Sequence, residues 1–259
     1  MELRLPVAVA IGYTSGSQRI RVMTEYWVNN SVFCPNCGSD MSNFENNKPV
    51  ADFYCKKCLE EYELKSKNGT LGKKIVDGAY STMIERLKSD NNPNFFFLTY
   101  DKSSLEIRNF LAIPKYFFVP DIIEKRKALN ASARRAGWIG CNIAMNNIPE
   151  LGKIFYIQDG IIKSKNEVLN RWSKTEFVKS THDVETKGWL LDVLVCVEKI
   201  KRRDFSLDEV YDFEDYLKAK HPSNNNVKAK IRQQLQFLRD KNVIEFVGRG
   251  QYRMRATSK

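Results

Sequence analysis

The sequence lacks several features that define common protein classes. No stretch approaches the roughly 18 consecutive apolar residues of a membrane-spanning helix, and the apolar run 5–12 is too short for one and has no convincing small-residue cleavage site of a secretion signal. Proline and glycine are sparse, at 8 and 13 residues in 259, which argues against a collagen-like or disordered chain. We therefore expect a cytoplasmic globular protein with no membrane partner.

Histidine is also scarce, and acidic residues are fewer than basic ones. The two histidines, His182 and His221, have no convincing partners and are expected at the surface, so a Ser/His/Asp or Cys/His mechanism has no support. The 31 acids are outnumbered by 42 bases, which gives a formal net charge of +11. This excess favours a polyanion such as nucleic acid over an acidic or neutral small molecule. We expect no organic cofactor.

Hydrophobic periodicity predicts an α/β core over residues 1–183. Apolar residues recur at helical spacing in 17–29 and 77–88. The continuous apolar run 95–100 is typical of a strand buried on both faces, and shorter strands are expected at 109–113 and 154–158. A mixed sheet with flanking helices is therefore predicted.

From Lys187 the composition changes, and residues 184–259 are predicted to form a separate domain. Helices are predicted over 188–200, 205–220 and 227–242, and a hairpin follows over 242–255. Ser206 and Glu209 form a capping-box signature, and Gly248-Arg249-Gly250 supplies a turn. This order is that of a winged helix domain, and its positive charge is concentrated in 226–259, which hold 9 bases and 2 acids.

Four of the six cysteines form two C-x-x-C pairs, Cys34/Cys37 and Cys55/Cys58. This spacing is typical of a four-thiolate zinc site, which leaves no open position for a substrate and is therefore structural. An iron–sulfur cluster and coincidental core cysteines are the alternatives. The isolated Cys141 and Cys196 stand in apolar surroundings and are interpreted as small buried hydrophobic residues.

Three charged residues flank the second cysteine pair. On a strand, Glu63 and Lys65 point to the same side while Leu64 faces the core, and a hairpin would set Asp52 beside them. Two adjacent carboxylates suit a hard divalent ion such as Mg²⁺, while a lysine can position or deprotonate an attacking water. The pattern D-x10-E-x-K also occurs by chance, and an alternating charged strand is usually a solvated face. Its place beside a zinc knuckle, in a basic chain with a winged helix, favours a nuclease.

At Asp52, Glu63 and Lys65 the sequence resembles the PD-(D/E)xK nuclease superfamily. The segments FENNKPVADFYC, ELKSK, NNPNFFFLTY, ARRAGWIGCNI and KIRQQLQFLRDK extend the likeness to the DpnI-like methyl-directed type II restriction endonucleases, over nearly the whole chain. The superfamily proline normally precedes the first acid directly, whereas here Val50 and Ala51 separate Pro49 from Asp52. The first sixteen residues and about 160–185 resemble the family least.

The resemblance implies a restriction-endonuclease-like nuclease domain (1–183) and a winged helix domain (184–259). It further implies Mg²⁺-dependent hydrolysis of double-stranded DNA at GATC sites with N6-methyladenine, and the main-chain carbonyl of Leu64 as an additional metal ligand. Composition and spacing by themselves imply only a nuclease that acts on DNA.

The third helix of the C-terminal region is the candidate recognition helix. Its apolar stripe places Arg232, Gln233 and Gln236 on the opposite face, where Gln can pair with adenine and Arg with guanine in the major groove. A solvated helix face is the alternative. Lys228, Lys230, Arg249 and Arg253 are expected to contact phosphates, which adds affinity without sequence information.

An N6-methyl group requires an apolar wall rather than a second hydrogen-bond acceptor. Trp138 is the candidate for this wall, with Arg134 and Arg135 suited to phosphates. The alternative for Trp138 is a core residue beside Ile139.

Together with these residues, the resemblance implies a monomeric type II endonuclease that acts on adenine-methylated double-stranded DNA. Two alternatives remain: a methylated-DNA-binding regulator with an inactive acidic–lysine set, and a nuclease indifferent to methylation.

Overall fold

The computed structural model describes residues 1–44, 51–88, 92–181 and 183–255. It separates into two compact units, of which the first comprises 1–145 and 151–175 and the second comprises 146–150 and 176–259. The superfamily proline at Pro49, the adjacent Val50 and the histidine at His182 lie outside the described residues.

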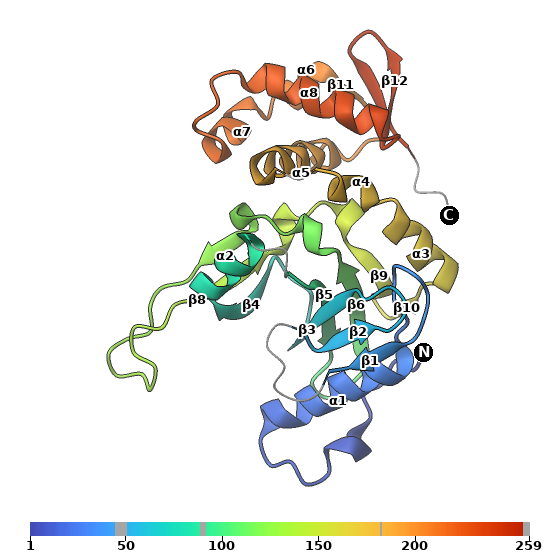
Figure 1. Cartoon of the computed structure of the whole chain (residues 1–259), viewed down its shortest axis with the longest axis vertical. Coiled ribbons are helices and arrows are strands. Elements are labelled where there is room, and N and C mark those ends of the chain that lie inside the picture. Colours follow the sequence, from blue (N-terminus) through green and yellow to red (C-terminus); the bar gives the residue numbers. More distant parts are fainter. Residues whose placement is uncertain (45–50, 89–91, 182, 256–259) are drawn as a thin grey trace. The chain divides into compact units, whose positions relative to one another are not determined.

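The first unit is built on a seven-stranded mixed sheet (Figure 1) with the order β1-β2-β3-β5-β6-β9-β10. The pair β3–β5 is parallel and its other neighbouring pairs are antiparallel. Its strands are β1 (Met41–Asn43), β2 (Phe53–Cys55), β3 (Glu61–Asn68), β5 (Asn94–Tyr100), β6 (Ile107–Ile113), β9 (Ile154–Gln158) and β10 (Ile161–Ile162).

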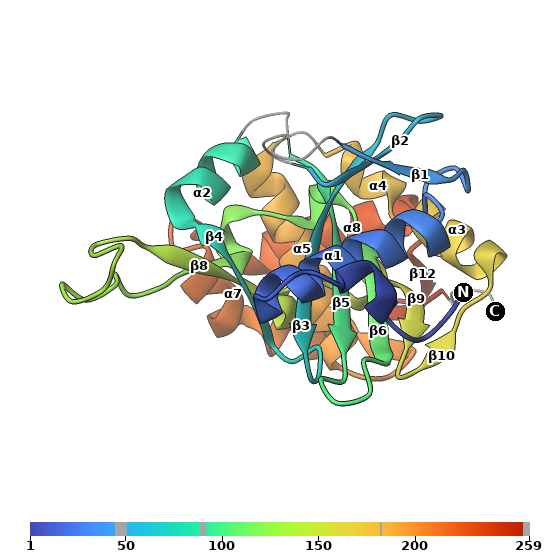
Figure 2. The ribbon, with the colours of Figure 1, turned by 90° about the horizontal axis from the view of Figure 1, so that it is seen from below.

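Strand β5 forms the centre of the core, as the apolar run 95–100 predicts. All seven of its residues are buried. On one face, Phe96 packs in the cluster that also holds Trp27 of α1 (Gly16–Ser31), and α1 crosses this sheet (Figure 2). On the other face, Phe95 packs against the tilted ring of Phe118, with 4.4 Å between the ring centroids. Layers on both sides therefore exclude water from this strand.

A second, three-stranded sheet of the first unit has the order β4-β8-β7. Its strands are β4 (Lys74–Ala79), β8 (Gly140–Ala144) and β7 (Ile123–Lys125). The helix predicted over 77–88 was wrong at its start, because Asp77 belongs to β4, where it pairs with Cys141 of β8, and α2 (Tyr80–Lys88) begins only afterwards. Residues 126–139 between β7 and β8 form an arm that projects from this sheet (Figure 1).

Short helices complete the first unit. Ser164 caps α3 (Lys165–Ser173) by accepting the Glu167 backbone N–H at 3.2 Å, and Trp172 of this helix joins the core cluster. The 3-10 helices along the chain are Val7–Ala10, Lys115–Phe117, Pro120–Ile122, Met145–Asn147 and Glu150–Gly152.

The second unit is the predicted helix-turn-helix domain with a hairpin. Its helices are α4 (Glu176–Lys179), α5 (Val184–Lys199), α6 (Leu207–Tyr211), α7 (Glu214–Lys220) and α8 (Val227–Asp240), and its sheet has the order β11 (Asp204–Ser206), β13 (Gln251–Met254) and β12 (Ile244–Gly248). The single helix predicted over 205–220 was wrong. Phe205 instead pairs with Tyr252 in β13, and the helical segment breaks between α6 and α7.

Local signals in the second unit are confirmed. The capping box of Ser206 and Glu209 is present at the start of α6. His221, expected at the surface, is instead 8% exposed: its Nε2 lies 2.9 Å from the Asp192 carboxylate and its ring stacks on Trp189. A buried polar pair of this kind depends on tertiary neighbours and leaves no local sequence signal.

No helix among the described residues is long and apolar enough to cross a membrane.

Candidate functional site

The antiparallel hairpin β2–β3 organises the candidate site. Phe53 pairs with Tyr62, and the Asp52 N–H donates to the Tyr62 carbonyl at 3.0 Å. Between the strands, Leu59 adopts a left-handed φ of +61°, which closes the turn that carries the second cysteine pair. The hairpin therefore carries cysteines at one end and acidic residues beside them.

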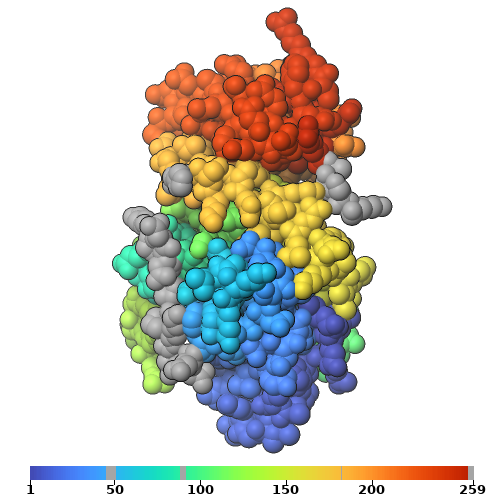
Figure 3. Space-filling view, turned by 45° about the vertical axis from the view of Figure 1, so that its right-hand side comes forward, coloured from blue at the N-terminus to red at the C-terminus, as the bar shows by residue number. Residues whose placement is uncertain are grey.

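The four cysteines Cys34, Cys37, Cys55 and Cys58 converge, with all four Sγ atoms within 4.8 Å of one another. The Sγ atoms lie 3.5 Å apart for Cys34–Cys58 and 3.4 Å apart for Cys37–Cys55. The turn of this knuckle around residue 56, cyan in Figure 3, lies at the surface of the first unit, while Cys34 and Cys55 are fully buried.

The thiols of this cluster differ in acidity. Burial raises the pKa of Cys34 well above its usual range. Burial also acts upward on Cys37, but hydrogen bonds with Ser39, Cys55 and Cys58 together outweigh it and lower the pKa of Cys37 to about 7. A metal ion binds thiolates, so it would remove the cost of a buried, unpaired thiolate at Cys34.

The cysteine geometry fits a tetrahedral metal ion. Four sulfurs around a zinc ion with bonds of about 2.3 Å lie about 3.8 Å apart. The observed separations are close to this value, and the cluster supplies four soft donors from two turns. The cluster can therefore hold zinc, with no position left for a substrate.

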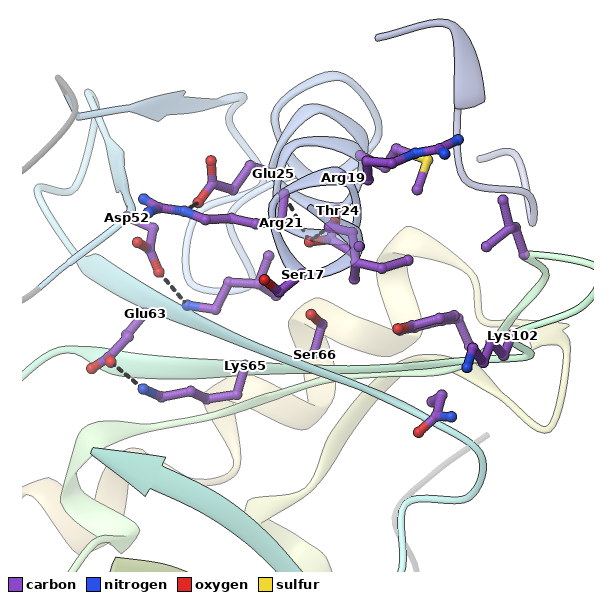
Figure 4. A pocket seen from close by; sticks show the side chains of 17 residues that line it. Ser17, Arg19, Arg21, Thr24, Glu25, Asp52, Glu63, Lys65, Ser66 and Lys102 are labelled. Atoms are coloured by element: carbon purple, nitrogen blue, oxygen red, sulfur yellow. Dashed lines mark hydrogen bonds and ion pairs between the residues drawn. The ribbon is translucent and has the colours of Figure 1, made fainter. Parts of the chain in front are cut away.

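Asp52, Glu63 and Lys65 lie together in a cleft of about 970 Å³ (Figure 4). The Leu64 N–H donates to the Asp52 carboxylate at 2.7 Å, which fixes this side chain against β3. The Lys65 ammonium lies 2.5 Å from Glu63 Oε1, because alternate residues of β3 point to the same side. The sheet thus brings two carboxylates and one ammonium to one wall of the cleft.

Two further residues, Asp77 and Arg86, enlarge this charged cluster. Lys65 also forms an ion pair with Asp77 of β4, and Arg86 of α2 donates to Glu63 Oε2 at 2.8 Å. Sequence patterns do not single out either residue, because both fell in a segment predicted as one amphipathic helix. Only the packing of β4 and α2 against the cleft reveals them.

The pKa values of Asp52 and Lys65 are shifted in this cluster. Burial raises the pKa of Asp52, and the N–H of Leu64 opposes this only in part, while the charge of Glu63 adds to it. Burial alone would lower the pKa of Lys65, but the carboxylates of Glu63 and Asp77 outweigh it and raise this pKa. Two acids that repel each other beside a cation are a suitable oxygen-ligand set for a divalent ion.

The opposite wall of the cleft is formed by α1. Arg21 and Glu25 of this helix pair with each other at 2.6 Å and lie near Asp52 (Figure 4). Arg19 and Lys102 also line the cleft and are exposed. Exposed cations around a carboxylate pair complement the negative charge of a nucleic-acid backbone.

Trp138 lies at the base of the arm and is half-buried. The Arg135 guanidinium stacks over its ring, 4.8 Å from the centroid. A Cβ on Gly140 would lie 2.8 Å from the indole ring, so the absence of a side chain there accommodates the tryptophan. Trp138 is therefore not among the buried core residues, and Arg134 and Arg135 are exposed beside it.

Helix α8 separates its apolar and polar residues as its periodicity predicts. Val227, Ile231, Leu235 and Leu238 are buried. Arg232, Gln233 and Gln236 are exposed, and Arg232 donates to the Tyr211 hydroxyl at 2.8 Å.

The expected phosphate contacts are all at least partly accessible. Arg249 is exposed at the hairpin turn, and Lys230 is half-buried. Lys228 lies 3.4 Å from Glu214, and Arg253 pairs with Asp204. These two cations are therefore partly neutralised within the unit.

Comparison with protein families gives two matches. The model of the DpnI, or Dam-replacing, family matches residues 1–181, and that of the Dam-replacing HTH domain matches residues 185–254. The chain belongs to the DpnI family. The first match includes the cysteine cluster and the carboxylate pair, and the second includes α5 to α8 and the hairpin.

Membership in the DpnI family implies a methyl-dependent restriction endonuclease, and the helix-turn-helix domain indicates DNA binding.

The two matched ranges meet between residues 181 and 185, whereas the compact units divide at residues 175 and 176. The short helix α4 accounts for this difference, because it packs in the second unit although its sequence belongs to the first family model.

Proposed function

We propose that this protein is a type II endonuclease that hydrolyses phosphodiester bonds of double-stranded DNA at GATC sites with N6-methyladenine, using Mg²⁺. The observation that carries the proposal is the convergence of Asp52, Glu63 and Lys65 on one wall of a cleft whose other wall carries exposed cations. Mg²⁺, methyladenine and the GATC sequence come from the family resemblance.

Asp52, Glu63 and the main-chain carbonyl of Leu64 would hold the magnesium ion. The two carboxylates suit it, because Mg²⁺ prefers oxygen ligands and retains several waters. When bound, the ion would acidify a water and stabilise negative charge on the phosphate. The N–H of Leu64 keeps the Asp52 carboxylate aimed at this place in the absence of the ion.

In this proposal, Lys65 positions the attacking water. Its ammonium is held by carboxylates at the cleft wall and can donate to a water or to a phosphate oxygen. A preorganised donor of this kind contributes about 10²- to 10³-fold to a rate.

Recognition of the methylated site is assigned to both units. Trp138 offers an apolar wall to the N6-methyl group, and Arg134 and Arg135 contact phosphates. Arg232, Gln233 and Gln236 of α8 read bases in the major groove. Phosphates are held by Lys228, Lys230, Arg249 and Arg253.

Two organisational features belong to the same proposal. Zinc at Cys34, Cys37, Cys55 and Cys58 acts as a structural link that fixes the β2–β3 hairpin on which the acids lie. The functional domains are a nuclease domain at 1–183 and a winged helix domain at 184–259, in a chain that is monomeric in solution.

Digestion of one plasmid tests the proposal. The plasmid is prepared with and without adenine methylation at GATC and is incubated with the protein in Mg²⁺ or in EDTA. Discrete fragments are expected only from the methylated plasmid in Mg²⁺, because both the ion and the methyl group are required.

Other results would change the assignment. If both plasmids were cut equally, the protein would be a nuclease that does not recognise adenine methylation. Intact plasmid in every sample, together with binding to methylated DNA in a mobility-shift assay, would assign the chain as a methylated-DNA-binding regulator.

A further inference from the structure

Two carboxylates from different sheets hold the Lys65 ammonium. Glu63 lies on the same strand, with its Oε1 2.5 Å from the lysine nitrogen, and Asp77 approaches from β4. The side chain of Asp77 is 5% exposed and that of Lys65 is 21% exposed. A cation in such a site depends on its partners, since water replaces them only poorly.

Asp77 is fixed by its own strand. Its Oδ1 accepts the backbone N–H of Gly78 at 2.7 Å, and the β4–β8 register shifts between Asp77 and Ala79. The Cys141 thiol approaches the Gly78 carbonyl at 3.5 Å from the paired strand β8. An irregularity in the strand therefore holds the carboxylate against Lys65 independently of Glu63.

Glu63, by contrast, has both of its oxygens engaged by cations. Lys65 contacts Oε1, and Arg86 donates to Oε2 at 2.8 Å. If Glu63 is a metal ligand, at least one of these contacts has to give way when the ion binds. The metal and the ammonium would then compete for one carboxylate unless the ammonium has another partner.

We propose that Asp77 is a positioning residue for Lys65, which retains the ammonium at the cleft wall when Glu63 turns to the metal ion. This inference rests on the proposed nuclease function. It assigns the two acids different tasks: Glu63 binds the ion, and Asp77 holds the lysine that acts beside it.

The central test is Asp77→Asn, which keeps the shape of the side chain and an acceptor for Gly78 but removes the charge. The single-turnover cleavage rate of a methylated duplex in Mg²⁺ is expected to fall about 10- to 100-fold, while DNA affinity in EDTA stays within about twofold. Asp77→Ser provides a second uncharged variant with an acceptor oxygen, and melting curves verify the fold of both. Asp77→Glu restores the charge and should recover part of the rate.

A readout without catalysis uses Ca²⁺ binding, measured by calorimetry in the absence of DNA. In Asp77→Asn, Lys65 relies on Glu63 and competes with the ion, so Ca²⁺ affinity should fall at least about threefold. In a Lys65→Met background, Asp77→Asn should change neither Ca²⁺ affinity nor residual cleavage by more than about twofold, because the residue acts through the lysine.

Glu124→Gln is the matched control. Glu124 lies in the same three-stranded sheet and pairs with Lys74 at 2.5 Å, and its side chain is 38% exposed and does not line the cleft. Its loss should leave the cleavage rate and Ca²⁺ affinity unchanged.

The outcomes separate this inference from the function on which it rests. Loss of cleavage in Glu63→Gln but a wild-type rate in Asp77→Asn would overturn the positioning role and leave the nuclease intact. An equal loss from Asp77→Asn with and without Lys65 would also overturn it, since Asp77 would then act by itself. Full cleavage in both Glu63→Gln and Lys65→Met would instead refute the proposed active site.

Discussion

The charged groups around Lys65 in the first unit are largely buried and paired with one another, whereas those on α8 of the second unit lie on its exposed face. Burial and the nearby charge of Glu63 raise the pKa of Asp52, and the carboxylates of Glu63 and Asp77 outweigh burial and raise the pKa of Lys65. Arg232, Gln233 and Gln236 are exposed above a buried apolar stripe. Mutual burial of charge prepares groups for chemistry, and exposed charge serves binding. The comparison predicts that the two functions can be lost separately.

Glu63→Gln should have the largest effect and separates the two functions most sharply. The cleavage rate should fall by about 10³-fold or more, about 4 kcal/mol, because a metal ligand and a partner of Lys65 lose their charge. DNA binding in EDTA should persist, as measured by mobility shift. Loss of binding equal to the loss of cleavage would contradict the separation.

Cys34→Ser tests the structural part of the first unit. Removal of one thiolate should reduce bound zinc, measured by elemental analysis, and lower the free energy of unfolding by about 3 kcal/mol. Cys141→Ala is the control, because this buried thiol lies outside the cluster and its loss should leave zinc content unchanged. If the wild type and Cys34→Ser gave the same melting curve and neither contained zinc, the zinc site would be excluded.

Trp138→Ala tests whether the first unit recognises adenine methylation in addition to cleaving DNA. The preference of cleavage for methylated over unmodified duplex should fall about tenfold, because a methyl group loses its apolar contact. Tyr26→Ala, which removes an aromatic residue that is 47% exposed on α1, should leave this preference unchanged. A retained preference in Trp138→Ala would move methyl reading to the second unit.

Arg249→Ala tests the exposed charge of the second unit. The slope of log affinity against log salt should decrease by about 1, with little change in sequence preference, because one phosphate contact is lost. Arg239→Ala is the matched control, since its guanidinium is already paired with Asp240 at 2.8 Å. Equal slopes for Arg249→Ala and wild type would remove the hairpin turn from the DNA interface.

Asp183→Ala should have the smallest effect and concerns a cap rather than a site. Asp183 accepts the Thr186 N–H at 2.6 Å, which lowers the pKa of its carboxyl group. Its contribution to stability is therefore present above its ordinary pKa of about 4 and is lost as the pH falls through the lowered value. The melting temperature of the variant should be about 2 °C below that of the wild type at pH 7, and the two melting temperatures should converge in acid.

Ser164→Ala is the uncharged counterpart in the first unit. Ser164 caps α3 through its hydroxyl, so its loss should lower the melting temperature by an amount that does not depend on pH. A pH-independent effect of Asp183→Ala would contradict the charged role of that cap.

Sequence alone determined the features that depend on local spacing. The buried run of β5, the apolar stripe of α8 and the capping box at Ser206 follow from periodicity and short-range hydrogen bonding. The two C-x-x-C pairs likewise predict a four-sulfur cluster, because each pair is a turn that aims two thiols at one point.

Tertiary structure decided the features that depend on neighbours from other elements. Asp77 pairs with Lys65 only because β4 forms a separate sheet beside the cleft, and His221 is buried only because α5 supplies Asp192 and Trp189. Likewise, 205–220 is interrupted because Phe205 finds a partner strand nearly fifty residues later. A local pattern records the spacing of residues along one element, whereas the energy of a buried charge or a paired strand depends on groups that the chain brings near only when it folds.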